Sequence, residues 1–315
     1  VKSSSPPPWS CTFGDILSFT VTALRIDMII KRADDKSKRE RLLLSLLESQ
    51  DFDGRQTGWL RDELHRLRRG LQGERDAAHY LDTHFRDAEN HVVLHDVRLC
   101  DGEDTAQIDH LIISRGFSIY LLETKNFACD VTITGQGEFT VEYGRKRWGI
   151  PSPIEQSKRH EVILARVLDR LGITGRTQSR PKFHHVVMFT PRAVIKRPRP
   201  DQFDTSHVIK ADQFASWREK FVEQHGALDV LGIALNMRSL DTIRAWGELL
   251  ETAHRPAVQL ALPDFIKPPA PQQLAPSASV NTDAAAALKR RLICATCQQK
   301  ISFPEGKFCW NNEHR

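Results

Sequence analysis

Two acidic residues and one lysine stand out because they lie within apolar segments. Asp109 follows Ile108 in QIDHLII, and Glu123 stands two residues before Lys125 in LLETK. A carboxylate inside an apolar strand is costly unless a partner or a metal ion compensates its charge. This combination of residue types is suited to binding a divalent metal ion and hydrolysing a phosphodiester.

The segment 107–125 is expected to form two apolar strands joined by a tight turn. Side chains at positions i and i+2 share one face of a strand, so Glu123 and Lys125 point the same way. A loop centred on Gly116 would place Asp109 opposite Glu123, with Cβ atoms about 5 Å apart. A two-residue loop would turn the two carboxylates to opposite faces. The first register brings both carboxylates and the ammonium group to one point.

The residue types match the preferences of Mg²⁺. This ion prefers oxygen ligands, keeps several waters, and usually takes one or two protein carboxylates together with phosphate oxygens. Asp109 and Glu123 would supply the carboxylates, and the backbone carbonyl of Thr124 could add a further oxygen. The ion would make a water easier to deprotonate and stabilise charge on the phosphate. Lys125 would position that water or pair with the phosphate as a point charge.

Motifs on either side extend this pattern. GERDAAHYL, which contains Gly73 and Glu74, opens a helix, and PIEQSKRH, which contains Gln156, opens a later one. An Asp with a downstream Glu-x-Lys on adjacent strands resembles the PD-(D/E)xK nuclease superfamily. Residues 70 to 190 resemble its nuclease-related branch, the NERD domain. Ile108 stands where the superfamily label has Pro, a substitution that is ordinary in the superfamily.

The resemblance implies a fold, a cofactor and a set of roles. The fold would be α/β, a restriction-endonuclease-like mixed sheet flanked by helices. Asp109 and Glu123 would bind Mg²⁺ or Mn²⁺. Lys125 would position the water, Gln156 would orient Lys125 or a phosphate, and Glu74 would provide a third acidic contact. The chain would then be a metal-dependent nuclease acting on DNA. Many nucleases of this superfamily cut both strands as dimers, so a homodimer is compatible with the resemblance.

The alternative interpretation is a non-catalytic nucleic-acid-binding protein that keeps a nuclease-like core. An Asp with a downstream Glu-x-Lys also arises by chance, and an exposed Glu–Lys pair contributes less than about 1 kcal/mol. Binding of Mn²⁺ at the core that is lost in Glu123→Ala would favour the enzyme. The sequence does not distinguish DNA from RNA, or endonuclease from exonuclease action.

The charge distribution is mildly basic. The formal net charge of +5 over 315 residues is compatible with nucleic-acid binding without proving it. Residues 176–200 contain no Asp or Glu, and their seven basic residues are Arg176, Arg180, Lys182, Arg192, Lys196, Arg197 and Arg199. This segment is either a solvated basic loop or a surface that contacts phosphates.

No segment is expected to span a membrane. The best candidate, residues 16–30, contains Arg25 and Asp27, and charges at that depth are expensive. The N-terminal region lacks the basic start and cleavage site of a signal peptide, although a start at Val1 leaves a preceding segment open. The sequence therefore predicts a cytoplasmic protein, and it contains no motif for a small-molecule cofactor.

Composition divides the chain into five parts. Residues 1–70 are an N-terminal extension that is partly helical, and residues 71–190 are the nuclease-like core. The order of elements in this core, α-β-β-β-α-β, predicts a mixed sheet flanked by helices. Residues 191–255 complete the core with helices. Residues 256–290, rich in Pro, Ala, Ser and Gln, read as a linker that cannot bury enough surface to become ordered. Residues 291–315 form a small zinc-finger-like module.

The C-terminal cysteines predict a second metal site. Cys294 and Cys297 form a Cys-x₂-Cys pair, Cys309 follows after eleven residues, and His314 follows after four more. Four Cys or His ligands suit a tetrahedral structural Zn²⁺. A Cys beyond Arg315 could replace His314 as the fourth ligand. A redox Cys-x-x-Cys is the rival interpretation, but no thioredoxin-like βαβ context surrounds it. Such a module would help to hold DNA.

Three histidines near these motifs are not expected to bind a metal ion. His110, beside Asp109, is expected to pack rather than to bind a metal. His184 and His185 are adjacent on a predicted strand, so their side chains point apart and cannot chelate one ion together.

Overall fold

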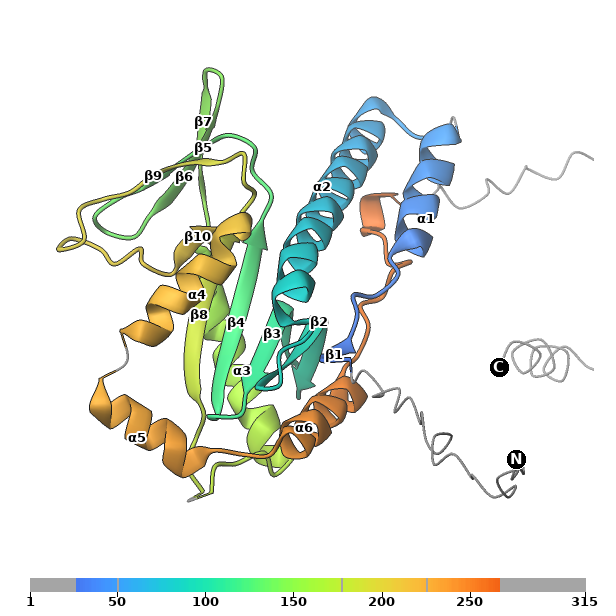
Figure 1. Cartoon of the computed structure of the whole chain (residues 1–315). Coiled ribbons are helices and arrows are strands. Elements are labelled where there is room, and N and C mark those ends of the chain that lie inside the picture. Colours follow the sequence, from blue (N-terminus) through green and yellow to red (C-terminus); the bar gives the residue numbers. More distant parts are fainter. Residues whose placement is uncertain (1–26, 50, 177, 225, 267–315) are drawn as a thin grey trace, which may run out of the picture. The chain divides into compact units, whose positions relative to one another are not determined.

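The structure is a computed structural model that describes residues 27–49, 51–176, 178–224 and 226–266. Figure 1 shows the arrangement of the elements. In chain order they are β1 (Ile29–Lys31), α1 (Ser37–Glu48), α2 (Gly54–Phe85), β2 (His91–Asp101), β3 (Asp104–Ser114), β4 (Ser118–Lys125), β5 (Asp130–Ile133), β6 (Phe139–Tyr143), β7 (Lys146–Ile150), α3 (Pro153–Arg170), β8 (Lys182–Phe189), β9 (Val194–Lys196), β10 (Val208–Lys210), the 3₁₀ helix η1 (Ala211–Gln213), α4 (Phe214–Glu223), α5 (Ala227–Asn236), α6 (Leu240–Ala253) and the 3₁₀ helix η2 (Asp264–Ile266). The predicted zinc module lies outside the described residues.

The main sheet has six strands in the order β1-β2-β3-β4-β8-β10. Strands β2, β3 and β4 form an antiparallel meander, while β1 pairs with β2, β8 with β4 and β10 with β8 in parallel. The parallel pair β4–β8 requires a crossover, and α3 lies in the chain between these strands. The predicted mixed sheet, with its α-β-β-β-α-β core, is confirmed.

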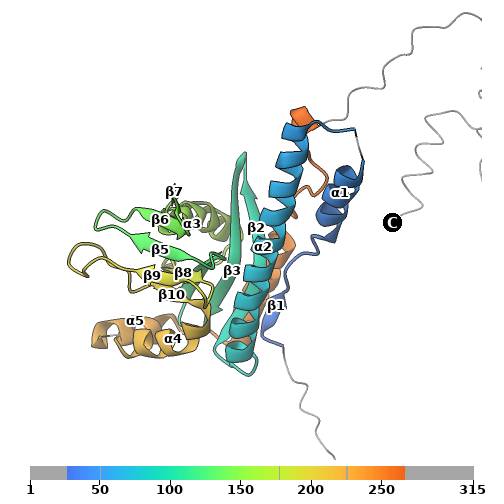
Figure 2. The same ribbon diagram turned by 90° about the horizontal axis from the view of Figure 1, so that it is seen from above.

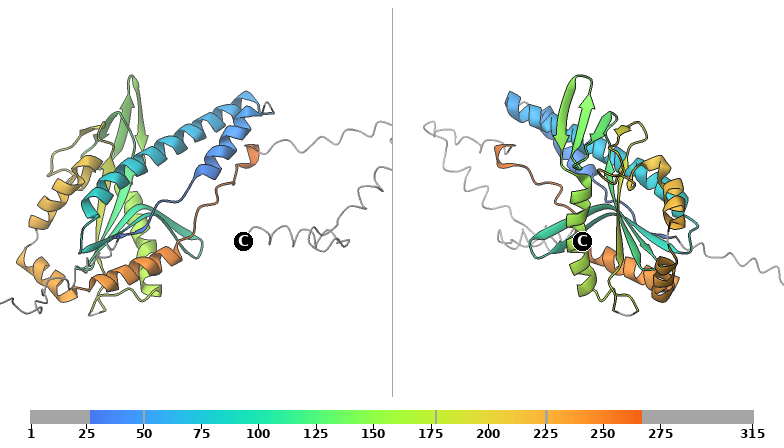
Figure 3. Two further views of the ribbon diagram at one scale, coloured as in Figure 1. Left: turned by 45° about the vertical axis from the view of Figure 1, so that its right-hand side comes forward. Right: turned by 90° about the vertical axis from the view of Figure 1, so that its left-hand side faces the viewer.

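Helices cover both faces of the main sheet. On one face, α3 and α6 pack through residues such as Val167 and Trp246 against Leu111 and its neighbours. On the other face, α2 and α4 pack through Leu81 and Phe214. Figure 2 shows α3 and α4 on opposite sides of β8, and Figure 3 shows α2 and α6 on opposite faces of the sheet. The result is a three-layer arrangement with two apolar cores.

Helix α2 is longer than the sequence predicts. It begins with a capping box, in which the Gln56 backbone N–H donates to Asp53 Oδ1 (2.8 Å) and the Asp53 N–H donates to Gln56 Oε1 (3.0 Å). The sequence suggests separate helices on either side of Gly70, because Gly costs about 1 kcal/mol in a helix interior. Packing overrides this cost, so the boundary expected at residue 70 falls inside one continuous helix.

Residues 131–141 form a hairpin that belongs to a second sheet. Strands β5 and β6 pair antiparallel, and together with β7 and β9 they make a four-stranded sheet in the order β7-β6-β5-β9. Apolar residues of this sheet, Val131 and Phe139 among them, pack against Val187 and Phe189 at the end of β8. The second sheet therefore lies beside the end of the main sheet where the acidic residues are found.

The first part of the predicted linker is folded. Gln259 donates from Nε2 to the backbone carbonyl of Asp35 (2.8 Å), and Ile266 is buried against Leu60 and Leu64. Composition suggested a linker from residue 256, yet apolar residues as far as Ile266 pack onto α1 and α2. Among the described residues, no helix is both long and apolar enough to cross a membrane.

Candidate active site

The β3–β4 hairpin has the register that a loop centred on Gly116 predicts. His110 pairs with Leu122 and Ile113 with Ile119, so the next position along the ladder places Asp109 opposite Glu123. The left-handed backbone conformation lies at Phe117 (φ 59°). Gly116 is needed for a different reason, since a Cβ there would lie 2.6 Å from the side chain of Ile233.

The alternation of side chains breaks at the level of Asp109. In β3, Ile108 and Leu111 belong to the same apolar cluster, and in β2 so do Leu94 and Val97. In both strands, the regular alternation of side chains between the two faces of the sheet is therefore displaced by one residue. Asp96 in β2 adopts a positive φ of 53° at that point. The Asp109 carboxylate accepts a 2.7 Å hydrogen bond from the Thr124 backbone N–H. A shared backbone irregularity thus holds Asp109 against β4.

Glu123, Lys125 and Gln156 contact one another directly. Lys125 Nζ lies 2.6 Å from Glu123 Oε1 and donates to Gln156 Oε1 at 3.2 Å. Gln156 lies in the first turn of α3, which starts with the N-cap Ser152 and Pro153. The start of α3 thereby fixes the orientation of the Glu–Lys pair.

Glu74 reaches the same site from α2. Gly73 allows this approach, because a Cβ at that position would lie 2.6 Å from Cβ of Asn126, the residue after β4. Asn126 Nδ2 donates to the Arg69 carbonyl at 2.7 Å, which ties α2 to the end of β4. Glu74 is close enough for its charge to raise the pKa of both Asp109 and Glu123. All five residues predicted for the site are therefore brought together.

The electrostatics of the site favour a cation. Burial, followed by the charges of Glu123 and Glu74, raises the pKa of Asp109 well above its ordinary value of 3.8. Burial also raises the pKa of Glu123, which is only 4% exposed, although Lys125 opposes this. Three carboxyl groups, Asp109, Glu123 and Glu74, meet two lysines, Lys125 beside Glu123 and Lys36 beside Glu74. A pocket of about 340 Å³ beside Asp109 is lined by further acidic residues, including Asp82 and Asp96.

These raised pKa values predict a pH dependence of stability. A carboxyl whose pKa is higher in the folded state binds more protons there, so its contribution is greatest at low pH and is lost as pH rises. The window runs upward from the unfolded-state values, 3.8 for Asp109 and 4.5 for Glu123, to the raised values. We expect the free energy of unfolding of the metal-free wild-type protein to fall across this window. The free energy of unfolding of Asp109→Asn should fall less. Denaturant unfolding over a pH series measures this. Parallel curves for wild type and variant would contradict it.

The donor set fits a hard divalent cation. Within the described ranges, no group of three or more His, Cys, Asp or Glu is arranged to hold a metal ion. Mg²⁺ does not require such a group, because it usually takes one or two carboxylates and keeps waters. Asp109 and Glu123 provide two carboxylates whose charges repel each other, with Glu74 nearby. An all-oxygen site with excess negative charge suits Mg²⁺ or Mn²⁺.

Sequence reasoning missed Lys36, which lies outside the predicted core. Its Nζ forms ion pairs with Glu74 (3.2 Å) and with Asp96 (3.1 Å). Gln107 Nε2 and the Asp34 backbone N–H also donate to the Asp96 carboxylate, at 3.0 and 3.2 Å. Lys36 thus offsets the negative charge of Glu74 and stabilises the irregular backbone at Asp96 of β2. No local signal could have shown this, because the partners are distant in sequence.

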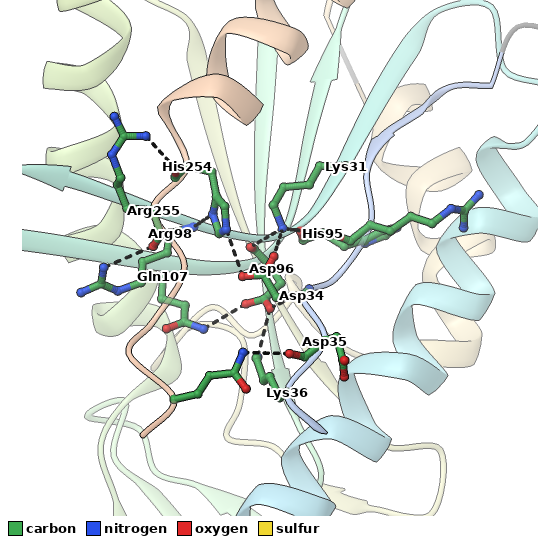
Figure 4. A network of polar contacts seen from close by, with 12 residues as sticks. Lys31, Asp34, Asp35, Lys36, His95, Asp96, Arg98, Gln107, His254 and Arg255 are labelled. Carbon is green, nitrogen blue, oxygen red and sulfur yellow. Dashed lines mark hydrogen bonds and ion pairs between the residues drawn. The ribbon is translucent and has the colours of Figure 1, made fainter. Parts of the chain in front are cut away.

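The contacts of Lys36 belong to a wider network around the irregular part of β2 (Figure 4). Lys31 Nζ donates to Asp34 (2.8 Å) and to the carbonyls of His95 and Asp96 (3.1 and 3.0 Å). His254 Nε2 lies 3.0 Å from Asp34 Oδ2, although the two residues are far apart in sequence. Segments before and after the core therefore support the strand that neighbours Asp109.

The histidines behave as expected. His110 is buried and its Nδ1 lies 2.7 Å from Nδ1 of His95. His184 stacks on Tyr120, whereas His185 contacts Ser157 and Glu161 of α3. His184 and His185 therefore point to opposite faces of the sheet, as expected for adjacent residues of a strand.

Much of the basic segment is engaged in surface ion pairs. The pairs are Arg180–Asp169, Lys182–Asp229, Lys196–Asp130 and Arg199–Asp201. Their acidic partners lie outside the segment, where a scan of the segment alone does not find them. These contacts favour the solvated interpretation for the residues involved.

The comparison with protein families agrees with the geometry. Residues 69–190 match the family model described as nuclease-related domain, NERD. No match was found among curated proteins or among solved structures. The matched segment runs from α2 to just beyond the end of β8 and contains all five site residues. Residues 69–190 are therefore a nuclease-related domain, the family that the sequence motifs indicated.

Proposed function

We propose that this protein is a metal-dependent nuclease that hydrolyses phosphodiester bonds in DNA. The observation that carries the proposal is the convergence of Asp109, in the middle of β3, with Glu123 and Lys125 at the end of the paired strand β4, where Lys125 Nζ lies 2.6 Å from Glu123. Burial is the main cause of the raised pKa of Asp109, and the charges of Glu123 and Glu74 add to it; these neighbouring carboxylates support the proposal, because negative charge favours a bound cation. The family match supplies the class of reaction.

Each residue has a role that follows from its contacts. Asp109 and Glu123 would hold Mg²⁺ or Mn²⁺, with Glu74 as a third acidic contact. The bound ion would supply positive charge to a phosphate and increase the acidity of water. Lys125 would position the attacking water or pair with the phosphate as a point charge.

Gln156 is proposed as a positioning residue. It accepts a hydrogen bond from Lys125 at 3.2 Å, and Lys125 in turn lies 2.6 Å from Glu123, so Gln156 helps to fix the orientation of the Glu–Lys pair. Glu74 is in turn held by Lys36 at 3.2 Å. The proposed site is thus supported on two sides, by α3 and by the segment that precedes α1.

Metal binding tests this assignment before any catalytic assay. We expect titration calorimetry of the full chain to show stoichiometric Mn²⁺ binding, and Glu123→Ala to lose it. Glu103→Ala is a matched control, because Glu103 is an exposed carboxylate in the turn before β3. Full Mn²⁺ binding by Glu123→Ala would contradict the assignment.

We also propose a structural Zn²⁺ at the C-terminal module. Cys294, Cys297, Cys309 and His314 would be its ligands, and the module would help to hold DNA. The titration separates the two metals, because Mn²⁺ is added to protein whose zinc content has been measured beforehand. Replacing Cys297 with Ser should lower the zinc content without changing the Mn²⁺ stoichiometry.

A further inference from the structure

A second pocket lies at the opposite end of β4 from the carboxylates. It has a volume of about 310 Å³, which is at the lower end of the range for small-molecule sites. Its buried floor includes Ser118 and Tyr120 of β4, and α5 contributes apolar side chains to its wall. Ser118 and Glu123 are five positions apart, which corresponds to roughly 16 Å along the strand.

Arg218 of α4 lines this pocket and forms no ion pair with any described residue. Its guanidinium donates to His91 Nε2 at 2.6 Å. It also lies over the rings of Phe85 and Tyr120, 5.7 and 5.8 Å from their centroids. Its Nε is buried and has no hydrogen-bond partner. A partly buried cation whose protein contacts are with neutral groups is stabilised by an added anion.

The surroundings of Arg218 strengthen this positive character. Burial and the charge of Arg218 lower the pKa of His91 to about 3, so His91 is neutral and serves as an acceptor. Arg115 adds a second guanidinium at the rim, where Nη1 donates to Asn90 Oδ1 at 3.2 Å. None of the residues lining the pocket is Asp or Glu.

The walls of the pocket are apolar. Val222 of α4 and Val230 of α5 are 47% and 54% exposed, and Ile233 packs against Gly116 in the hairpin turn. Exposed apolar side chains beside a convergent polar group are typical of a site for an organic molecule. An inorganic anion would use Arg218 but would leave these side chains in water.

We infer that this pocket binds a small organic anion, a carboxylate or a phosphate monoester that carries an apolar or aromatic group. The anionic end contacts Arg218, and the apolar portion lies against Val230 and Ile233. This inference does not depend on nuclease activity, because none of the pocket residues belongs to the carboxylate site.

Titration calorimetry of the full chain in EDTA tests the inference, since EDTA prevents phosphate from binding through a divalent ion. The probes are dTMP, hexanoate, inorganic phosphate and hexylammonium. We expect saturable binding of dTMP or hexanoate, at least about tenfold weaker binding of phosphate, and none of hexylammonium. Binding of dTMP alone identifies a phosphate monoester as the ligand class, and binding of hexanoate alone identifies a carboxylate.

Three variants locate the binding. Arg218→Met should weaken it at least about tenfold, and Val230→Trp should block the apolar wall by replacing an exposed side chain. Lys220→Met, an exposed residue on the same helix, should bind as wild type does. Since Arg218→Met also loses contacts with two aromatic rings, circular dichroism must show that it is folded. If Arg218→Met is not folded, the binding measured with Val230→Trp tests whether the anion binds in this pocket.

The inference is overturned by any of three results. One is the absence of saturable binding of both organic anions to the wild-type protein. Another is equal binding by wild type, Val230→Trp and a folded Arg218→Met. The last is phosphate binding as tightly as the organic anions, which would leave the apolar wall without a role.

Discussion

Replacing Asp109 with Asn is expected to abolish metal-dependent cleavage while leaving the fold as stable as wild type or more stable. The Asn Oδ1 can still accept the hydrogen bond from Thr124 N–H, which is 2.7 Å in the wild-type protein. The variant loses the negative charge, and with it one of the two proposed metal ligands. We expect cleavage to fall by at least roughly 10³-fold, which corresponds to about 4 kcal/mol of lost transition-state stabilisation.

The stability of this variant provides an independent measurement. Because burial, followed by the charges of Glu123 and Glu74, raises the pKa of Asp109, removing the ionisable group relieves both desolvation and repulsion, so Tm in metal-free buffer should equal or exceed that of wild type. Asp109→Ala should also lose cleavage, but it leaves the Thr124 N–H without an acceptor and should unfold at a lower temperature. Glu103→Gln is the control. Cleavage by Asp109→Asn at more than about a tenth of the wild-type rate would contradict the assignment of Asp109 as a metal ligand.

The second large effect concerns Lys125. We expect Lys125→Met to abolish cleavage and also to destabilise the metal-free protein, because Glu123 would keep a buried charge with no cation beside it. Loss of one partner from a fully buried pair costs about 3–5 kcal/mol. Since Lys125 is 20% exposed, we expect Lys125→Met to lower the free energy of unfolding by roughly 2–3 kcal/mol. This decrease should grow as Glu123 ionises with rising pH.

Two comparisons separate this effect from a general loss of packing. Lys158→Met removes a lysine from an exposed pair, in which Nζ lies 2.8 Å from Glu155, and should cost less than about 1 kcal/mol. Adding Glu123→Gln to Lys125→Met should recover most of the lost stability, because no unpaired charge remains. Denaturant unfolding measures all four proteins. A double variant as unstable as Lys125→Met would show that packing, not charge, is responsible.

The candidate site could be predicted mainly because its centre is local. Asp109, Glu123 and Lys125 lie within one hairpin, where loop length and the two-residue period of a strand determine which side chains meet. Glu74 and Gln156 come from two helices, and only the motifs shared with the nuclease family indicated that they belong to the site. No period or spacing connects them to the hairpin.

The remaining features of the site arise from long-range packing. Lys36 meets Glu74 and Asp96 across tens of residues, and a lysine in a charged segment carries no sign of this. The shift in side-chain facing at Asp96 and Asp109 was also missed, because a regular strand was assumed. Such an irregularity depends on two neighbouring strands changing together.

The elements of the fold also divide into those that local sequence predicts and those that depend on long-range packing. The long amphipathic or apolar elements were found, while the three-residue strands β1, β9 and β10 were not. Strands this short are defined by the partner they pair with rather than by their own residues. Helix α5 was missed as well. Many of its side chains, such as Val230 and Leu235, remain exposed, so it lacks the single buried stripe by which helices are recognised.

The most direct test of the central claim is cleavage by the full chain. Supercoiled plasmid, linear duplex and single-stranded DNA would each be incubated with Mg²⁺ or Mn²⁺, with EDTA as the control. We predict cutting of at least one substrate that requires the metal ion. No cutting of any substrate, together with retention of DNA in a gel shift that weakens with salt, would contradict the account and would indicate a binding protein built on a nuclease fold.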